Sequence, residues 1–207
     1  MESKLFTPVT FGPLTLRNRT IRSAAFESMC PGNAPSDMLL DYHRSVAAGG
    51  IGMTTVAYAA VTQSGLSFDR QLWMRPEIIP GLRRLTDAIH AEGAAAGIQL
   101  GHCGNMSHKS ICGCMPVGAS SGFNLYSPTF VRGLRADELP EMARAYGRSV
   151  NLAREAGFDS VEIHAGHGYL ISQFLSPSTN HRKDEFGGSL QNRMRFMAVS
   201  YTHLTLP

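Results

Sequence analysis

The sequence predicts an α/β fold in which helices alternate with the strands of a parallel sheet. Three observations favour this class. Short apolar runs alternate along the chain with segments whose apolar residues recur at helical spacing. The strand-like runs are almost continuously apolar, as in a parallel sheet that is covered on both faces. Polar side chains, histidines among them, gather where two of the predicted strands end.

Four strand–helix units follow one another. A short hairpin over residues 9–16 precedes a first strand over 20–26. Ser36 is placed to cap the first helix, which stops at Gly49. The later elements are a strand over 51–57, a helix over 76–92, a strand over 97–100, an irregular segment over 101–136, a helix opened by Asp137 and ended by Gly157, a strand over 160–164, and a helix beginning near Ser189.

Length, composition and charge restrict the class of protein. The chain has 207 residues, 43% hydrophobic and 17% charged, which suffices for one globular domain with a core. The formal net charge is +3 and basic residues are scattered, so we expect no nucleic-acid interface. No apolar run approaches the roughly 18 residues of a membrane span, and the N-terminus lacks the apolar core of a signal peptide. We therefore expect a cytoplasmic protein.

The four cysteines do not suggest a disulfide framework in a chain of this length. Cys112 and Cys114 lie near His102 and His108 in the sequence, which raises the alternative of a metal site. Structural zinc sites usually use longer spacers and four ligands, so one Cys-x-Cys pair is a weak signal. We expect ordinary loop cysteines and no metal.

Two parallel architectures compete. A doubly wound dinucleotide-binding sheet needs a Gly-rich turn between strand and helix, and residues 101–104 are too polar and irregular for that. A TIM barrel places its chemistry at the carboxyl ends of several strands, where Gln99, His102, His164 and His167 fall. We favour the (β/α)8 TIM barrel. Because a barrel needs eight units in about 250 residues, the chain is predicted to be truncated to about its first four β/α units.

This count also sets the predicted boundaries. Residues 1–199 form the N-terminal half of a barrel, whereas residues 200–207 lose the helical pattern and contain no Asp, Glu, Lys or Arg. We interpret residues 200–207 as a non-native or mis-translated tail. A half-barrel leaves its first and fourth strands as open edges, so we expect self-association through those edges.

Several stretches carry a resemblance to a known family. Residues 161–170 read VEIHAGHGYL, and residues 173–188 contain QFLSP and NHRKDEFGG. Residues 4–8 read KLFTP, and residues 99–104 read QLGHCG. Together these stretches resemble the old yellow enzyme family of flavin-dependent ene-reductases, over about residues 4–199.

The resemblance implies a fold, cofactors and a reaction. Members of that family are TIM barrels that bind FMN without a covalent bond and reduce it with NADH or NADPH. They transfer hydride to an alkene that is activated by a carbonyl or nitro group. The chain is therefore expected to derive from an FMN-dependent oxidoreductase acting on a small α,β-unsaturated substrate. The natural alkene and the preferred nicotinamide are not specified by the sequence.

The resemblance also assigns residues to the flavin. The small side chains and the aromatic ring after the first strand are expected to offer backbone contacts and flat walls, and a residue that ends the second strand to offer a main-chain bond. The amide of Gln99 suits the pyrimidine edge of the flavin, which carries donors and acceptors. The cofactor-binding residues implied are Ser23, Ala24, Ala25, Phe26, Tyr58 and Gln99.

The catalytic residues implied are His164, His167 and Tyr169. As N–H donors, the two histidines would polarise a substrate oxygen and stabilise enolate-like charge. The phenol of Tyr169, with a pKa near 10, would protonate the α-carbon. Without the surrounding motif, a His-x-x-His pair could equally cap a turn or bind a metal.

Some residues depart from the family pattern, and others are expected to have structural roles. Asn105, Phe26 and the order Ala165-Gly166 depart from common family patterns, which puts the substrate preference in question. Arg182, Asp184, Asn192 and Arg193 are expected to serve architecture, with a phosphate contact of Arg193 as the weaker alternative.

Two functional alternatives stay open. The chain could be a half-barrel that binds no flavin and has no activity, because the phosphate loops and a strand-five cation expected from the family are missing. It could instead be a metal-dependent hydrolase that uses His102, His164 and His167.

Overall fold

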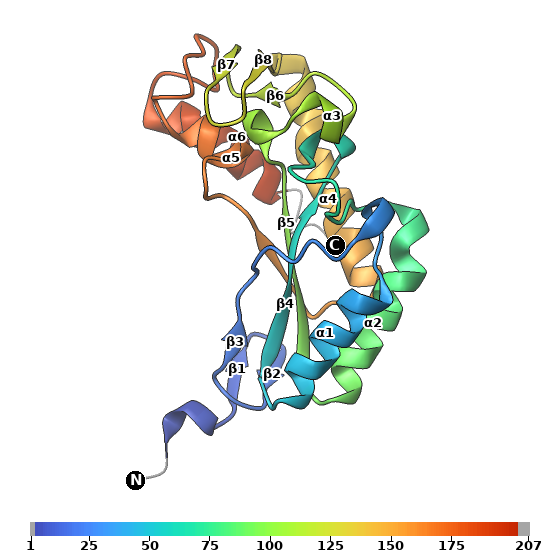
Figure 1. Ribbon diagram of the computed structural model, residues 1–207. Coiled ribbons are helices and arrows are strands. Elements are labelled where there is room, and N and C mark those ends of the chain that lie inside the picture. The colour runs from blue at the N-terminus through green and yellow to red at the C-terminus, as the bar shows by residue number, and fades with distance from the viewer. Residues whose placement is uncertain (1–2, 203–207) are drawn as a thin grey trace. The chain divides into compact units, whose positions relative to one another are not determined.

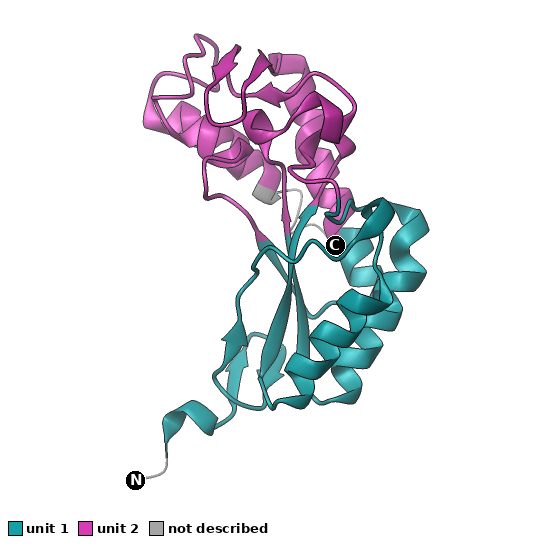
Figure 2. Ribbon diagram, viewed as in Figure 1, with its two compact units in different colours: residues 1–59, 70–99, 151–162 teal, residues 60–69, 100–150, 163–207 magenta. Residues whose placement is uncertain are grey.

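The computed structural model describes residues 3–202, with side chains as far as Ser200. The chain divides into two compact units, which Figure 2 shows in different colours. Unit 1 comprises residues 1–59, 70–99 and 151–162, and unit 2 comprises residues 60–69, 100–150 and 163–207.

A four-stranded sheet has the order β3-β4-β5-β9. In unit 1 the Ala95 N–H donates to the Gly52 carbonyl, and in unit 2 the Val61 N–H donates to the Gly101 carbonyl. The pairing of β4 and β5 thus advances in the same direction along both strands, so it is parallel. Strands that follow one another in the sequence are neighbours in this sheet, as in a TIM barrel. Each of the four predicted strands has a counterpart in it. Their bounds are β3 (Ile21–Arg22), β4 (Met53–Ala60), β5 (Ala95–Gly101) and β9 (Ser160–Ile163).

Unit 1 has two helices on one side of its part of the sheet, α1 (Asp37–Ala48) and α2 (Ile79–Ala91) (Figure 1). The Ser36 hydroxyl accepts the Leu39 N–H at 3.2 Å, so the predicted N-cap is confirmed. A 3₁₀ turn precedes α2 within the predicted helix 76–92, because Pro76 and Pro80 restrict that start. The predicted hairpin is the antiparallel pair of β1 (Val9–Phe11) and β2 (Leu14–Leu16).

The first strand of the sheet is shorter than predicted, because β3 stops at Arg22. The Arg22 guanidinium donates to the Thr55 carbonyl at 2.7 Å, and the Glu27 carboxylate accepts the Ala57 N–H at 3.3 Å. These two side chains form hydrogen bonds with backbone groups of β4 that would otherwise pair with a longer β3. Residues 23–26 therefore lie outside the sheet.

Unit 2 contains a small three-stranded sheet in the order β6-β8-β7. It lies in the segment 101–136, so the prediction that this segment is irregular was wrong in part. The strands β7 and β8 form an antiparallel hairpin, and β6 is parallel to β8. The elements are α3 (Lys109–Cys112), β6 (Val117–Gly118), β7 (Gly122–Asn124), β8 (Thr129–Gly133), α5 (Leu170–Leu175) and α6 (Leu190–Thr202), and α4 (Leu139–Glu155) crosses from unit 2 into unit 1. Short 3₁₀ helices occupy Lys4–Phe6, Pro31–Asn33, Gln63–Gly65, Pro76–Ile78, Gly104–Met106 and Ala136–Glu138.

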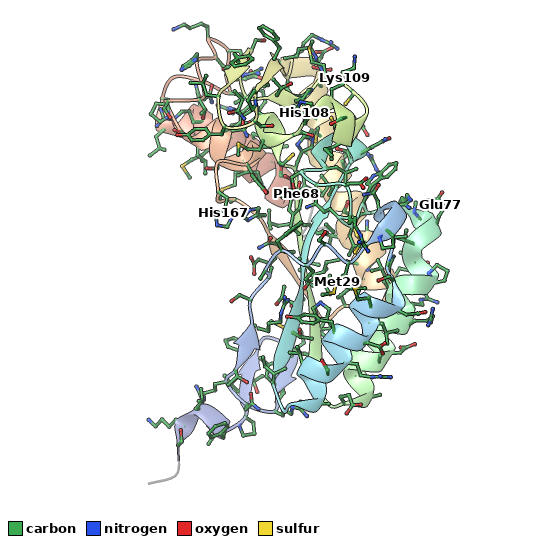
Figure 3. The ribbon with its side chains drawn as sticks, viewed as in Figure 1. Met29, Phe68, Glu77, His108, Lys109 and His167 are labelled. Carbon is green, nitrogen blue, oxygen red and sulfur yellow. The ribbon has the colours of Figure 1, made fainter. Side chains whose placement is uncertain are left out.

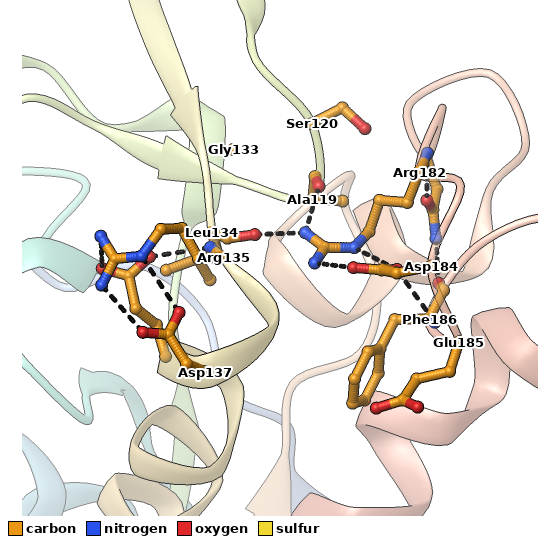
Figure 4. Close-up of polar contacts among 12 residues, drawn as sticks. Ala119, Ser120, Gly133, Leu134, Arg135, Asp137, Arg182, Asp184, Glu185 and Phe186 are labelled. Atoms are coloured by element: carbon orange, nitrogen blue, oxygen red, sulfur yellow. Dashed lines mark hydrogen bonds and ion pairs between the residues drawn. The ribbon is translucent and has the colours of Figure 1, made fainter.

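Arg182 fixes the loop after α5 to this small sheet (Figure 4). Its guanidinium donates to the Ala119 carbonyl at 3.0 Å and to the Leu134 carbonyl. Asp184 accepts from the same guanidinium at 3.0 Å and 2.5 Å, and this contact lowers the pKa of the Asp184 carboxyl. Arg193 donates to the Leu175 carbonyl at 2.7 Å. The architectural roles predicted for these arginines are therefore supported.

The predicted boundary at residue 200 falls inside α6. Ser200 is buried, and its hydroxyl donates to the Phe196 carbonyl at 2.9 Å. Residues 203–207 of the predicted foreign tail lie outside the described residues, so that interpretation stays a prediction. Within residues 3–202, no helix combines the length and apolar character that crossing a bilayer requires.

The strands β3 and β9 are the two edges of the four-stranded sheet. Open edges can pair with another chain, so self-association stays a prediction. Sedimentation of the purified chain as a single monomeric species would contradict it.

Arg17 joins the ends of both helices of unit 1. Its guanidinium donates to the carbonyls of Ala47 at 2.6 Å, Ile51 at 2.9 Å and Glu92 at 2.7 Å. Two of these carbonyls lie at the C-terminal ends of α1 and α2, where a cation is favourable.

We predict that Arg17→Met lowers the free energy of unfolding by about 2–4 kcal/mol, because hydrogen bonds from a charged donor are lost together. Arg19→Met is the matched control. Arg19 is exposed and contacts Thr7 at 3.3 Å, so its loss should change stability by less than about 0.5 kcal/mol. Urea unfolding of both variants measures the difference, and equal midpoints would refute the role of Arg17.

Candidate active site

The loop after β9 brings His164, His167 and Tyr169 together in unit 2. The Nδ1 atom of His167 lies 3.1 Å from the Nε2 atom of His164, within hydrogen-bond distance. The Tyr169 ring stands at 84° to the His164 ring, with 4.8 Å between the ring centroids. His164 is buried, and His167 is exposed on the loop (Figure 3). The structure therefore groups the three residues as predicted, while their catalytic roles stay predictions.

The backbone of this loop explains the grouping. The His164 N–H donates to the Leu100 carbonyl at 2.8 Å, so the chain beyond β9 is still paired with β5. His167 and Gly168 then adopt left-handed conformations, with φ of 54° and 68°. For a residue with a Cβ, that conformation costs roughly 1–2 kcal/mol. Strain of this kind persists where the surroundings impose it, and it often marks a functional site.

The two imidazoles can act as a pair of donors. Between two neutral imidazole rings, one nitrogen donates and the other accepts. A ligand oxygen between the rings would replace this bond, and it would accept from both His164 and His167 once the accepting ring takes its other tautomer. Burial raises the pKa of Tyr169, and a hydrogen bond with Ser67 opposes that shift. The phenol is therefore protonated at neutral pH and can donate a proton.

Gln173 joins the loops that follow β5 and β9. Its Nε2 has three acceptors within hydrogen-bond distance for its two hydrogens: the Gly168 carbonyl at 2.6 Å, Asn105 Oδ1 at 2.8 Å and the Cys103 carbonyl at 3.1 Å. Its Oε1 accepts the Asn105 N–H at 3.2 Å. Gly104 is required here, because a Cβ at that position would overlap the Gln173 amide. The sequence showed Gln173 only as part of a motif, and its contacts depend on two loops far apart in the chain.

His102 is a structural residue of unit 2. Its Nδ1 accepts the Gly104 N–H at 2.9 Å, and its Nε2 lies 3.1 Å from the Ser64 hydroxyl. Full burial lowers the pKa of His102 to about 3, so the ring is neutral. Among residues 3–200, no three His, Cys, Asp or Glu side chains are arranged to hold a metal ion. The alternative of a metal-dependent hydrolase therefore has no support in the described part of the chain.

Four of the predicted flavin residues lie in unit 1 after β3. Ser23 and Ala25 are exposed, Ala24 is half-buried, and the Phe26 side chain is 58% exposed. This segment thus presents backbone and a flat apolar ring at the surface, which suits an aromatic ligand. Tyr58 is buried on β4, and its carbonyl accepts from Gln71 Nε2 at 3.1 Å.

Gln99 lies near the end of β5 in unit 1, with 9% of its surface exposed. Its Nε2 donates to a carboxylate oxygen of Glu162 on β9. Because a carboxylate accepts only from the amide nitrogen, this contact fixes which way the Gln99 amide faces. The bond uses one amide hydrogen, so the oxygen and the second hydrogen fit the donor and acceptor positions of the flavin edge. Sequence reasoning missed Glu162, although a charge within an apolar strand was a visible signal.

The donor set of unit 1 therefore fits the flavin ring system: an oriented amide, exposed backbone and a flat apolar side chain. A comparison with known proteins decides the family. The family model for NADH:flavin oxidoreductases and NADH oxidases matches residues 4–199. The chain belongs to this family. FMN and NAD(P)H are the cofactors of the family, so both cofactor predictions are confirmed for the family to which the chain belongs.

Relatives and solved structures agree with this family. The chain is 42% identical over 192 residues to the 4,4'-dithiodibutanoate disulfide reductase of Rhodococcus erythropolis, covering 93% of this chain and 48% of that protein. It is 37% identical to the NADPH dehydrogenase of Bacillus subtilis, covering 95% of this chain and 58% of that protein. The chain thus spans about half the length of these relatives.

The solved structures confirm the predicted fold. An old yellow enzyme homologue from Zymomonas mobilis superposes with a TM-score of 0.90 at 29% identity, over 98% of this chain and 59% of that one. Morphinone reductase in complex with tetrahydroNAD gives 0.92 at 28% identity, over 98% and 60%. The chain therefore matches the part of these TIM barrels that holds the first four β/α units.

We predict a pH effect from His102. Its folded pKa of about 3 lies below its usual 6.5, so the unfolded chain binds a proton that the folded chain excludes. The contribution of the neutral His102 ring to the free energy of unfolding is therefore fully present above pH 6.5. It is lost progressively as the pH falls from 6.5 toward 3. The slope should approach about 1.4 kcal/mol per pH unit within that window.

Urea unfolding at several pH values measures this slope. His102→Asn keeps an acceptor for the Gly104 N–H and should remove the slope, whereas His108→Asn, at an exposed position, should retain it. The assignment fails if His102→Asn and the wild-type chain lose stability equally on acidification.

Proposed function

We propose that this chain carries the cofactor-binding and substrate-polarising residues of an FMN-dependent oxidoreductase that reduces the C=C bond of α,β-unsaturated carbonyl or nitro compounds with NAD(P)H. The grouping of His164, His167 and Tyr169 after β9 is the observation that carries the proposal. Family membership over residues 4–199 supports it. A cytoplasmic location remains part of the proposal.

The histidines act on the substrate oxygen. His164 and His167 each donate one N–H to it, in place of the bond they share at 3.1 Å. Two N–H donors held this close together stabilise the negative charge that develops on this oxygen. The burial of His164 strengthens its contribution, because fewer water molecules compete for the oxygen.

Tyr169 supplies the proton that completes the reduction. Its phenol packs edge-on against His164, and its raised pKa keeps the proton in place until a strong base forms beside it. The α-carbon of an enolate is such a base, and transfer to it leaves a phenolate that solvent can reprotonate.

The cofactor is held by residues of unit 1. The Gln99 oxygen, oriented by Glu162, accepts from the flavin pyrimidine edge, and the segment after β3 offers backbone and the Phe26 ring. Bound FMN, reduced by NAD(P)H, supplies the hydride. The residues proposed for this role are Ser23, Ala24, Ala25, Phe26, Tyr58 and Gln99.

A second class of electron acceptor deserves a direct comparison. The relative with 42% identity is named as a reductase of 4,4'-dithiodibutanoate, a small disulfide. We therefore compare the rates at which an enone and this disulfide oxidise the reduced flavin complex. The acceptor that reacts faster identifies the substrate class.

The first test is titration of the purified chain with FMN, followed by flavin fluorescence. We expect binding, and a loss of about tenfold in affinity for Gln99→Leu, because one hydrogen bond of about 1–1.5 kcal/mol is removed. Gln191→Leu, on the surface of α6, is the control and should bind like the wild-type chain. No binding by the wild-type chain would favour the alternative of a half-barrel without flavin.

The second test is anaerobic mixing of the reduced complex with cyclohexenone. Replacing both histidines, His164→Ala with His167→Ala, should slow reduction by roughly 10²–10³-fold. Tyr169→Phe should slow it by about 10²-fold. His108→Ala lies outside the proposed site and should leave the rate unchanged. Turnover retained in the double variant would reject the assigned roles.

A further inference from the structure

The short helix α3 of unit 2 ends at Cys112 (Figure 1). The thiol of this cysteine faces the thiol of Cys114. The Sγ atom of Cys114 lies 3.7 Å from the Sγ atom of Cys112, and the Cys112 thiol donates to the Cys114 carbonyl at 3.2 Å. A disulfide needs about 2.05 Å between its sulfur atoms. Rotation of the two side chains must therefore shorten the distance between the sulfur atoms from 3.7 Å to about 2.05 Å.

The residue between the thiols favours this closure. Gly113 adopts a left-handed conformation, with φ of 74°, and its N–H donates to the Lys109 carbonyl at 2.9 Å. This conformation ends the helix and turns the chain back. The two sulfur atoms lie 3.7 Å apart across this turn, whereas two residues of an extended chain advance by about 6.6 Å.

The two cysteines differ in access. Cys112 is 2% exposed, whereas Cys114 lies on the surface. Cys114, Met115 and Arg132 also line a cavity of about 580 Å³, large enough for a small organic molecule. A reagent that enters this cavity therefore meets Cys114 first, and Cys112 is shielded from it.

The wall of the cavity does not select one sign of charge. Its arginines, Arg132, Arg135 and Arg148, are matched by Asp137, Glu138 and Glu141. Arg132 pairs with Glu138 at 2.6 Å, and Arg148 pairs with Glu141 at 2.8 Å. The apolar side chains of the lining, Met115 and Leu134 among them, suit the carbon and sulfur atoms of a small ligand.

We propose that Cys112 and Cys114 form a dithiol site that reduces low-molecular-weight disulfides by thiol–disulfide exchange. The Cys114 thiolate attacks one sulfur of the disulfide, which forms a mixed disulfide and releases one thiol. The Cys112 thiolate then attacks the Cys114 sulfur, which closes the intramolecular disulfide and releases the second thiol. The external disulfide is reduced to two thiols, and the two cysteines are oxidised by the same two electrons.

The other cysteines do not take part. Cys30 and Cys103 are 4% and 0% exposed, so a disulfide in solution does not reach their thiols, and burial raises the pKa of each to about 12. Partial burial and the neighbouring Cys112 also raise the pKa of Cys114, to about 11. Exchange is therefore best measured at mildly alkaline pH. The reaction requires neither flavin nor nicotinamide, so it is separable from the proposed oxidoreductase activity.

The test incubates the reduced full chain with glutathione disulfide, without FMN or NAD(P)H, and then alkylates the remaining thiols. Trypsin cleaves after Lys109 and Arg132, so residues 110–132 form one peptide that holds both cysteines and neither of the others. Mass spectrometry of this peptide should show the loss of two hydrogens and of both alkylation sites.

Two variants define the order of attack. Cys112→Ser should leave one glutathione on Cys114, because no second thiol can displace it. Cys114→Ser should leave Cys112 free of glutathione and still open to alkylation after denaturation. Accumulation of glutathione on wild-type Cys114 without closure would overturn the proposal. So would modification of Cys112 in Cys114→Ser at the wild-type rate, or a wild-type peptide that stays fully reduced.

Discussion

The hydrogen bond from the His164 N–H to the Leu100 carbonyl, 2.8 Å long, is the contact on which the site in unit 2 depends. It carries the pairing of β9 and β5 one step beyond the strand, so the next residues leave the sheet from a fixed point. The left-handed pair His167 and Gly168 then returns the chain toward His164. A shift of one residue in this register would turn His164 to the other face of the sheet.

Three polar side chains hold together segments that lie far apart in the sequence. Gln173 joins the loops after β5 and β9, Arg182 joins the loop after α5 to the small sheet, and Arg17 joins the ends of two helices. Each side chain satisfies backbone carbonyls that secondary structure leaves unpaired. Each has several donors in fixed geometry, which is why an amide or a guanidinium occupies these positions.

The sequence was most informative where the signal was local. The helix cap at Ser36 and the grouping of His164 with His167 after the fourth strand are encoded within a few residues, and both were predicted. The early end of β3 could not be predicted, because it depends on Arg22 and Glu27 reaching backbone groups of another strand. The small sheet within residues 101–136 was missed for a similar reason: its strands are two to five residues long and have no clear alternation.

The central claim is that His164 and His167 act as one unit on a single ligand oxygen. Nitrogen-15 NMR of the histidine-labelled chain, with FMN and a non-reducible saturated ketone, tests it most directly. The account predicts that the ring nitrogens of His164 and His167 shift together as the ketone is added, while those of buried His102 do not move. Independent shifts of the two rings, or a shift of only one, would contradict it.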